Sequence, residues 1–267
     1  MKRPAPSVRI LTALAALGLA GMACALPGQS PPVEGIILEP TVRPPEAVVT
    51  AAPEVLAPTS PPSEPVMASS AFRDDFDGTM DIAWTWFQGP EPGYSLTHTP
   101  GWLRLNLSSG SFLSTTPPEN LLVRPAPGAN FDLNTYLRFN PHNNFEIAGL
   151  VVVFDDDSVL QFGRGGCFLE APTPGCIGDG LYFDNIQNGS AVGGNFANPA
   201  VLGFDYTLRL QRTGNTYTAS YTDSNGGSGT LGSHTVDGTP VSIGLIAAQA
   251  TVAQPYADFD YFEMTSP

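Results

Sequence analysis

Apolar and polar residues alternate in short runs along this chain from about residue 71 onward, as they do in β-strands with one buried face. The run 102–107 alternates in this way, and so does 135–139, which ends shortly before Pro141. Residues 148–154 are instead continuously apolar, which is typical of a strand covered on both faces. The sequence therefore predicts an all-β domain, because no apolar repeat of helical period interrupts these runs.

Further strands are expected where similar short runs recur between turn-rich stretches. They lie at 159–162, 181–186, 206–212, 216–222, 241–247 and 257–264. The acidic turn 155–157 predicts that 148–154 and 159–162 form a hairpin. Trp84 and Trp86 are two residues apart, so on a strand they share one face. Two antiparallel sheets in a jelly-roll sandwich are the predicted assembly.

Residues 1–26 have the pattern of an export signal. Lys2, Arg3 and Arg9 precede an apolar run, 10–20, that is too short for an ordinary membrane-spanning helix. The sequence GMAC, which ends at Cys24, resembles a bacterial lipobox, with glycine where leucine is usual, and predicts lipidation of Cys24. The same place also fits the small-x-small rule for ordinary signal cleavage, so a freely secreted protein is the alternative.

Residues 27–70 are expected to be a disordered Pro-rich linker, and residues 71–267 to be the folded domain. Proline pairs recur along the linker, and no apolar period in it is long enough to bury a face. Fully extended, the linker would reach on the order of 100 Å. We expect an extracellular cell-surface lipoprotein that contacts the membrane only through its N-terminal lipid anchor.

The charge and the titratable residues exclude several function classes. A net charge of −14, with Lys2 as the only lysine, argues against binding to nucleic acid or to an anionic membrane surface. The three histidines, at positions 98, 142 and 234, lie in scattered polar contexts and suggest no catalytic triad. The motif Asp258-x-Asp260-x-x-Glu263 could supply two carboxyls across a glycosidic bond. The motif matches the closing strand of a sandwich domain better than it matches a pair of catalytic carboxyls, so we expect no catalysis.

Several short motifs together resemble a known domain. In chain order they are DDFD at 74–77, WTW at 84–86, YSL at 94–96, PGWLRL at 100–105, AGLVV at 148–152, LRL at 208–210 and DFDYF at 258–262. This series is similar to the concanavalin A-like β-sandwich found at the C-terminus of glycoside hydrolase family 43 β-xylosidases and in related stand-alone bacterial domains. The resemblance implies a concanavalin A-like jelly roll.

The resemblance also implies a structural calcium ion where the first and last strands meet. Its ligands would be Asp75, the carbonyl of Gly101 and Asp260, with waters completing the shell of oxygens that calcium requires. The alternative is that Asp75 caps a turn and that Asp260 faces solvent.

The cysteines agree with export. Cys167 and Cys176 flank a loop rich in proline and glycine, and two such cysteines in an exported protein predict a disulfide. The disulfide either stiffens a loop beside a ligand groove or has only the structural role of closing a long loop.

The function we expect is that of a carbohydrate-binding module without its own catalysis, acting as a monomer on a polysaccharide. If 148–154 is a central strand, its neighbours bring Gln161, Arg164, Tyr182 and Asp184 around one depression. Sugar sites combine aromatic faces with amide, carboxylate and guanidinium groups of this kind. The alternative is a structural or protein-binding surface module that keeps the sandwich without a sugar site.

Overall fold

The computed structural model describes residues 70–88, 93–128, 130–173, 175–199, 203–250 and 255–266. The predicted signal peptide, residues 27–69 of the predicted linker and the lipidation site at Cys24 lie outside these residues, whereas Ser70 is the first residue of a strand. The described part of the chain forms β-strands and connecting turns, and none of it forms a helix long and apolar enough to cross a membrane.

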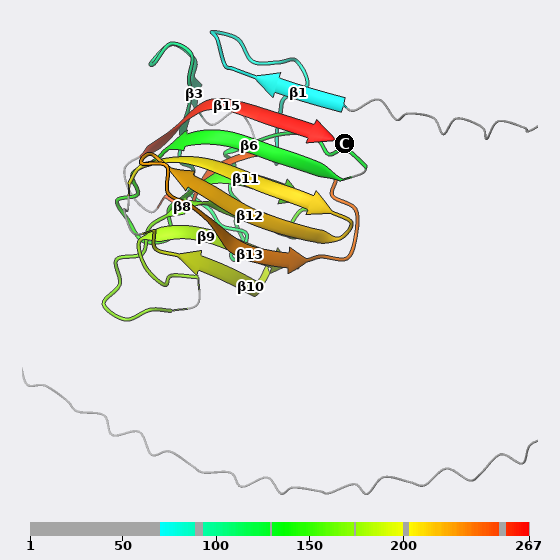
Figure 1. The fold of residues 1–267 in the computed structure, drawn as a ribbon. Helices are drawn as coiled ribbons and strands as arrows, with labels where there is room; N and C mark the ends of the chain where they lie inside the picture. The colour runs from blue at the N-terminus through cyan, green and yellow to red at the C-terminus, as the bar shows by residue number, and fades with distance from the viewer. Residues whose placement is uncertain are drawn as a thin grey trace, which may run out of the picture. The chain divides into compact units, whose positions relative to one another are not determined.

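The strands form two antiparallel sheets (Figure 1). The first, called here the β6 sheet, has the order β13 (Ser228–Thr235), β12 (Thr216–Asp223), β11 (Asp205–Thr213), β6 (Phe131–Arg138), β15 (Tyr256–Ser266), β4 (Leu103–Asn106) and β3 (Tyr94–Ser95), and β1 (Ser70–Asp74) also pairs with β15. The second, called the β8 sheet, has the order β10 (Ser190–Ala197), β9 (Gly180–Gln187), β8 (Val159–Gly165), β7 (Ile147–Val153), β14 (Ser242–Ala248), β5 (Leu121–Pro125) and β2 (Thr85–Trp86). The predicted all-β sandwich of two antiparallel sheets is confirmed.

The main core lies between the two sheets. In β6 every second residue from Phe131 to Leu137 is buried, and the residues between them point away from the core. The β6 sheet therefore has one face packed and one face toward solvent, as the alternating pattern predicted.

The β8 sheet is covered on both faces. All seven residues of β7 are buried, which confirms the interpretation of its continuous apolar run. On the face away from the main core, Val151, Val159 and Ile186 form a second apolar cluster. Phe112, from the connection between β4 and β5, packs into this cluster. The second face is thus covered by connecting segments rather than by a further sheet.

The first and last strands are adjacent. Figure 1 shows β1 beside β15, and the register pairs Asp74 with Phe262. The Asp74 carboxylate accepts hydrogen bonds from the Trp84 indole (2.8 Å) and from the backbone amide of Phe76 (2.9 Å). Trp84 and Trp86 both pack against the main core, as their spacing predicted. Asp74 is therefore bound to the opening turn through its carboxylate and to the final strand through the pairing of β1 with β15.

Candidate functional site

A cavity of about 360 Å³ opens on the outer face of the β8 sheet, and we call it the β8 cavity. Gln161 of β8 and Asp184 of β9 lie directly opposite each other in the sheet. Tyr182 lies two residues before Asp184 and therefore on the same face. All three line the cavity, so the structure brings together three of the four residues predicted to bind a ligand.

Glycines keep the cavity open. A Cβ atom at Gly165 would lie 2.9 Å from the Tyr182 ring, and one at Gly194 would lie 3.0 Å from the Asp184 carboxylate. Both glycines line the cavity. A side chain at position 194 would cover the Asp184 carboxylate, and one at position 165 would press on the Tyr182 ring, so glycine at both positions keeps this space free.

Gln161 and Asp184 form a coupled pair at the base of the cavity. The Gln161 Nε2 donates to Asp184 Oδ2 over 3.1 Å. The Gln161 Oε1 is buried and has no hydrogen-bond partner among the described residues. Burial raises the pKa of the Asp184 carboxyl to about 6, and the hydrogen bond from Gln161 partly opposes this rise. The pair therefore offers a free amide acceptor beside a carboxyl that changes its protonation state near pH 6.

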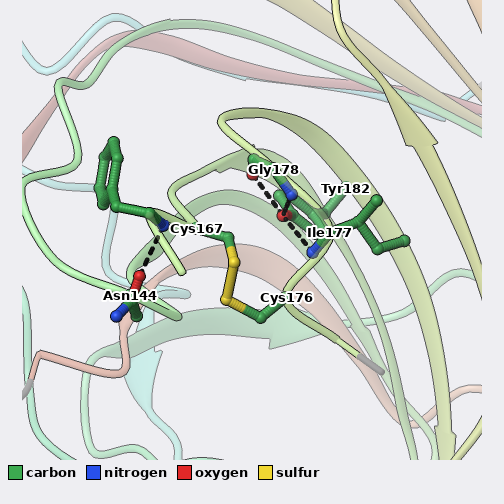
Figure 2. The surroundings of a disulfide bond; sticks show 7 residues. Asn144, Cys167, Cys176, Ile177, Gly178 and Tyr182 are labelled. Carbon is green, nitrogen blue, oxygen red and sulfur yellow. Dashed lines mark hydrogen bonds between the residues drawn. A yellow bond between two sulfur atoms is a disulfide. The ribbon is translucent and has the colours of Figure 1, made fainter. Parts of the chain in front are cut away.

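The hydroxyl of Tyr182 is already engaged (Figure 2). It accepts hydrogen bonds from the amides of Ile177 (3.1 Å) and Gly178 (2.9 Å), and it donates to the Gly178 carbonyl. The residue is only 4% exposed, and its ring packs edge-on against Phe196. The structure thus gives Tyr182 the role of positioning the 166–179 loop, and its ring has little exposed surface on which a sugar could stack.

That loop contains the predicted disulfide, which is confirmed between Cys167 and Cys176 (Figure 2). The two Cα atoms are 5.1 Å apart, and both cysteines are buried. Next to the bridge, Asn144 Oδ1 accepts a hydrogen bond of 2.6 Å from the Phe168 amide. Ile177, which follows the bridge directly, lines the β8 cavity, so the stapled loop forms one side of it.

Arg164 must be removed from the predicted ligand site. It is three residues from Gln161, and an odd spacing on a strand places the two side chains on opposite faces. Arg164 is 1% exposed; its guanidinium forms an ion pair with Asp179 and donates to three backbone carbonyls. Its role is to tie strand ends and loops together inside the sandwich, and it does not line the cavity.

Sequence reasoning missed several residues that border the cavity. Phe145 and Gln249 both line it, with positive φ angles of 72° and 68°. Val192 lines it from a point in β10 where the pairing with β9 shifts register. For Val192 a signal did exist, because the two glycines that follow it in a strand pattern are typical of a β-bulge. For Phe145 and Gln249 the sequence carried no comparable signal.

Of the residues predicted to hold calcium, Asp75 and Asp260 lie near each other, and Asp75 is already paired with Arg73. Burial raises the pKa of Asp260; Arg73 opposes this rise, and the nearby carboxylates of Asp75 and Asp77 add to it. Asp75 forms an ion pair of 2.6 Å with Arg73. A Cβ on Gly101 would lie 3.4 Å from Asp77 Oδ1, so the Asp77 carboxylate lies next to Gly101. The described residues contain no group of three or more His, Cys, Asp or Glu side chains arranged to hold a metal, so calcium stays a prediction.

The carboxylate motif of the last strand has a structural role at its first position. Asp258 of β15 accepts two hydrogen bonds from Arg104 of β4, at 2.6 and 2.7 Å. Both side chains are largely buried, so this bidentate pair fastens β4 to β15. The carboxylate of Asp258 is thus held by Arg104 within the β6 sheet.

Comparison with known proteins agrees with this fold. Residues 73–166 match the family described as "Beta xylosidase C-terminal Concanavalin A-like domain". A "Xylan 1,3-beta-xylosidase" of Vibrio sp is 28% identical in an alignment of 213 positions that covers 73% of this chain and 37% of that protein. The chain therefore spans well under half the length of this relative.

Solved structures of family 43 proteins are also similar to this chain over a similar share of its length. The "Bacteroides ovatus Xyloglucan PUL GH43B" superposes with a TM-score of 0.60 and 27% identity, over 72% of this chain and 38% of that one. The "xylan beta-1,4-xylosidase from Bacillus Halodurans C-125" gives a TM-score of 0.60 at 20% identity, over 73% and 39% of the two chains. The described domain is a concanavalin A-like β-sandwich similar to the C-terminal domain of family 43 glycoside hydrolases.

Proposed function

We propose that this protein binds carbohydrate in the β8 cavity and carries out no catalysis of its own. The observation that carries the proposal is the Gln161–Asp184 pair, which lines a glycine-lined hollow and combines a carboxyl with an amide whose oxygen has no hydrogen-bond partner among the described residues. Sugar hydroxyls both donate and accept hydrogen bonds, so a neighbouring amide oxygen and carboxyl suit them.

The choice of first ligands follows from the similar proteins. Two of them are named as xylosidases and a third as part of a xyloglucan system. We therefore propose xylose-containing oligosaccharides as the first class to test.

The proposed setting is the cell surface. The basic and apolar N-terminus, the candidate lipidation site at Cys24 and the Pro-rich stretch 27–70 support an exported protein tethered by a lipid. In this arrangement a monomeric domain would hold polysaccharide close to the cell.

A second candidate function is binding to a partner protein. The observation that favours it is the exposure of large apolar side chains beside the cavity, among them Phe145 and Val192. A protein interface would draw on this apolar surface and would not depend on Gln161 or Asp184.

Titration calorimetry of the full-length protein with xylo-oligosaccharides tests the proposed function. Gln161→Ala and Asp184→Ala should each weaken binding about tenfold or more, because each removes a hydrogen bond to the sugar in a buried setting. Thr218→Ala, on the outward face of β12 in the other sheet, is the matched control and should bind like the unaltered protein. Affinity that survives both cavity substitutions would place the sugar site elsewhere.

We also propose that calcium stabilises the fold through Asp260, together with the Gly101 carbonyl and with Asp77 or Asp75. At 100 times its dissociation constant, an ion that binds only the folded state adds about 2.7 kcal/mol to the free energy of unfolding. Excess chelator should lower the melting temperature, and Asp260→Ala should remove this response, whereas Asp237→Ala, at an exposed position after β13, should retain it. A melting temperature that does not respond to the chelator in the unaltered protein would rule out the ion.

A further inference from the structure

Four large apolar side chains surround the mouth of the β8 cavity while remaining open to solvent. Leu113, Phe145, Ile177 and Val192 line the cavity, and their exposed fractions lie between 42% and 59%. We call these four residues the apolar rim. They come from four separate segments of the chain, so their clustering does not follow from one hydrophobic stretch. Exposed apolar side chains gathered around a cavity are typical of a binding surface.

The backbone holds Phe145 in the rim at a conformational cost. Its φ of 72° lies in the left-handed region, which a bulky aromatic residue rarely adopts. The Phe145 amide donates to the Gly166 carbonyl over 2.8 Å. The buried carboxylate of Glu146 accepts hydrogen bonds from the amides of His142 (2.7 Å) and Asn143 (3.1 Å), which fixes the preceding turn. A strained residue held this firmly beside a cavity points to a function for its side chain.

Two further backbone irregularities lie beside the same cavity. Val192 occupies the bulge of β10, where the pairing with β9 skips from Ala191 to Gly193. A bulge turns the side chain of the extra residue away from the regular alternation. Gln249, which also lines the cavity, has a φ of 68°. Three unusual backbone positions therefore meet at one opening.

The cavity offers few polar groups in comparison with this apolar rim. Glu146 and Tyr182 line it, but the polar atoms of both are already hydrogen-bonded, Tyr182 to backbone and Glu146 to backbone amides and the Asn143 side chain. The side chains that remain for a ligand are those of Gln161, Asp184 and Gln249. An unsubstituted sugar chain has hydroxyls all round and would leave many of them without partners against the rim, which is costly.

We propose that the β8 cavity takes a saccharide that carries an apolar aryl or acyl substituent. The sugar hydroxyls lie against Gln161 and Asp184, and the substituent lies against Phe145 and Val192. This inference rests on the proposed carbohydrate binding and adds the chemical class of the ligand. A volume of about 360 Å³ is at the small end for a ligand site and suits a short ligand of this kind.

The test compares two ligands that share one sugar. Methyl β-D-xyloside and 4-methylumbelliferyl β-D-xyloside are titrated into the full-length protein, with free 4-methylumbelliferone as a third ligand. Burial of the aryl group should make the aryl xyloside bind about tenfold tighter or more than the methyl xyloside. Phe145→Ala and Val192→Ser should remove most of this advantage, so that the two xylosides bind these variants with similar affinities.

Val241→Ser is the matched control, because Val241 is 55% exposed, like Val192, but does not line the cavity. It should keep the preference for the aryl xyloside. If both xylosides bind equally and both depend on Asp184, the proposed function stands and this inference fails. If free 4-methylumbelliferone binds as tightly as its xyloside, the cavity recognises an apolar molecule rather than a substituted sugar, and the inference also fails. If no xyloside binds through Asp184, both proposals fail.

Discussion

Replacing Gly163 with alanine is expected to lower the free energy of unfolding by about 3 kcal/mol or more. The added Cβ would overlap the Ala148 carbonyl oxygen of the neighbouring strand and would lie 2.6 Å from the carbonyl carbon. Both obstacles are backbone atoms, and β7 cannot move aside because it is paired with β8 on one side and with β14 on the other. Urea unfolding of the variant and of the unaltered protein measures the difference.

Gly128→Ala is the control for this substitution. A Cβ at Gly128 meets no atom within 4 Å, so alanine should leave stability unchanged or raise it slightly. A Gly163→Ala protein that unfolds at the same urea concentration as the unaltered one would mean that the close approach of β7 and β8 is not required for the fold.

Stability is expected to fall as the pH rises through the range in which Asp184 titrates. The folded-state pKa is about 6, and the ordinary value is 3.8. Between these values the folded protein binds more protons than the unfolded one, so its stability decreases with rising pH. The total decrease from this group is roughly 3 kcal/mol at most, since about 1.4 kcal/mol corresponds to one pKa unit. Contact with solvent through the cavity will reduce it.

Asp184→Asn isolates this effect. Asparagine is neutral at every pH and can still accept the hydrogen bond from Gln161. The variant should match the unaltered protein near pH 4 and should be the more stable of the two at pH 7 to 8, as measured by thermal melts across this range. Asp156→Asn, at an exposed turn position, should show no such pH-dependent gain. Equal pH profiles for Asp184→Asn and the unaltered protein would show that Asp184 is ionised at little cost in the fold.

The strands with strong apolar patterns could be predicted from the sequence. The alternation at 135–139 and the continuous run at 148–154 correspond to β6 and β7, and the acidic turn after β7 does join a hairpin. Strands β10 and β13 were not predicted. They lie at the edges of their sheets, are rich in glycine, serine or threonine, and bury few large side chains, so they lack an apolar period.

The base of the candidate site follows from the period of two in a β-strand, and the rim does not. That period places Tyr182 and Asp184 on one face, and the antiparallel pairing of β8 with β9 brings Gln161 opposite Asp184. The same period excludes Arg164, which was included wrongly. Phe145 and Leu113 reach the cavity from connecting segments whose course depends on long-range contacts, and no local pattern encodes such contacts.

The most direct test of the central claim, that the β8 cavity binds sugar, is to locate the site on the folded protein. Methyl-labelled full-length protein is titrated with xylo-oligosaccharide and followed by NMR. We predict that the methyl signals of Ile177, Ile186 and Val192, which line the cavity, shift with one common affinity. Unchanged signals for these three residues would contradict the claim. The contradiction would be strongest if the aromatic signals of Trp102 and Tyr136 shifted instead, because these two rings contact each other on the β6 sheet.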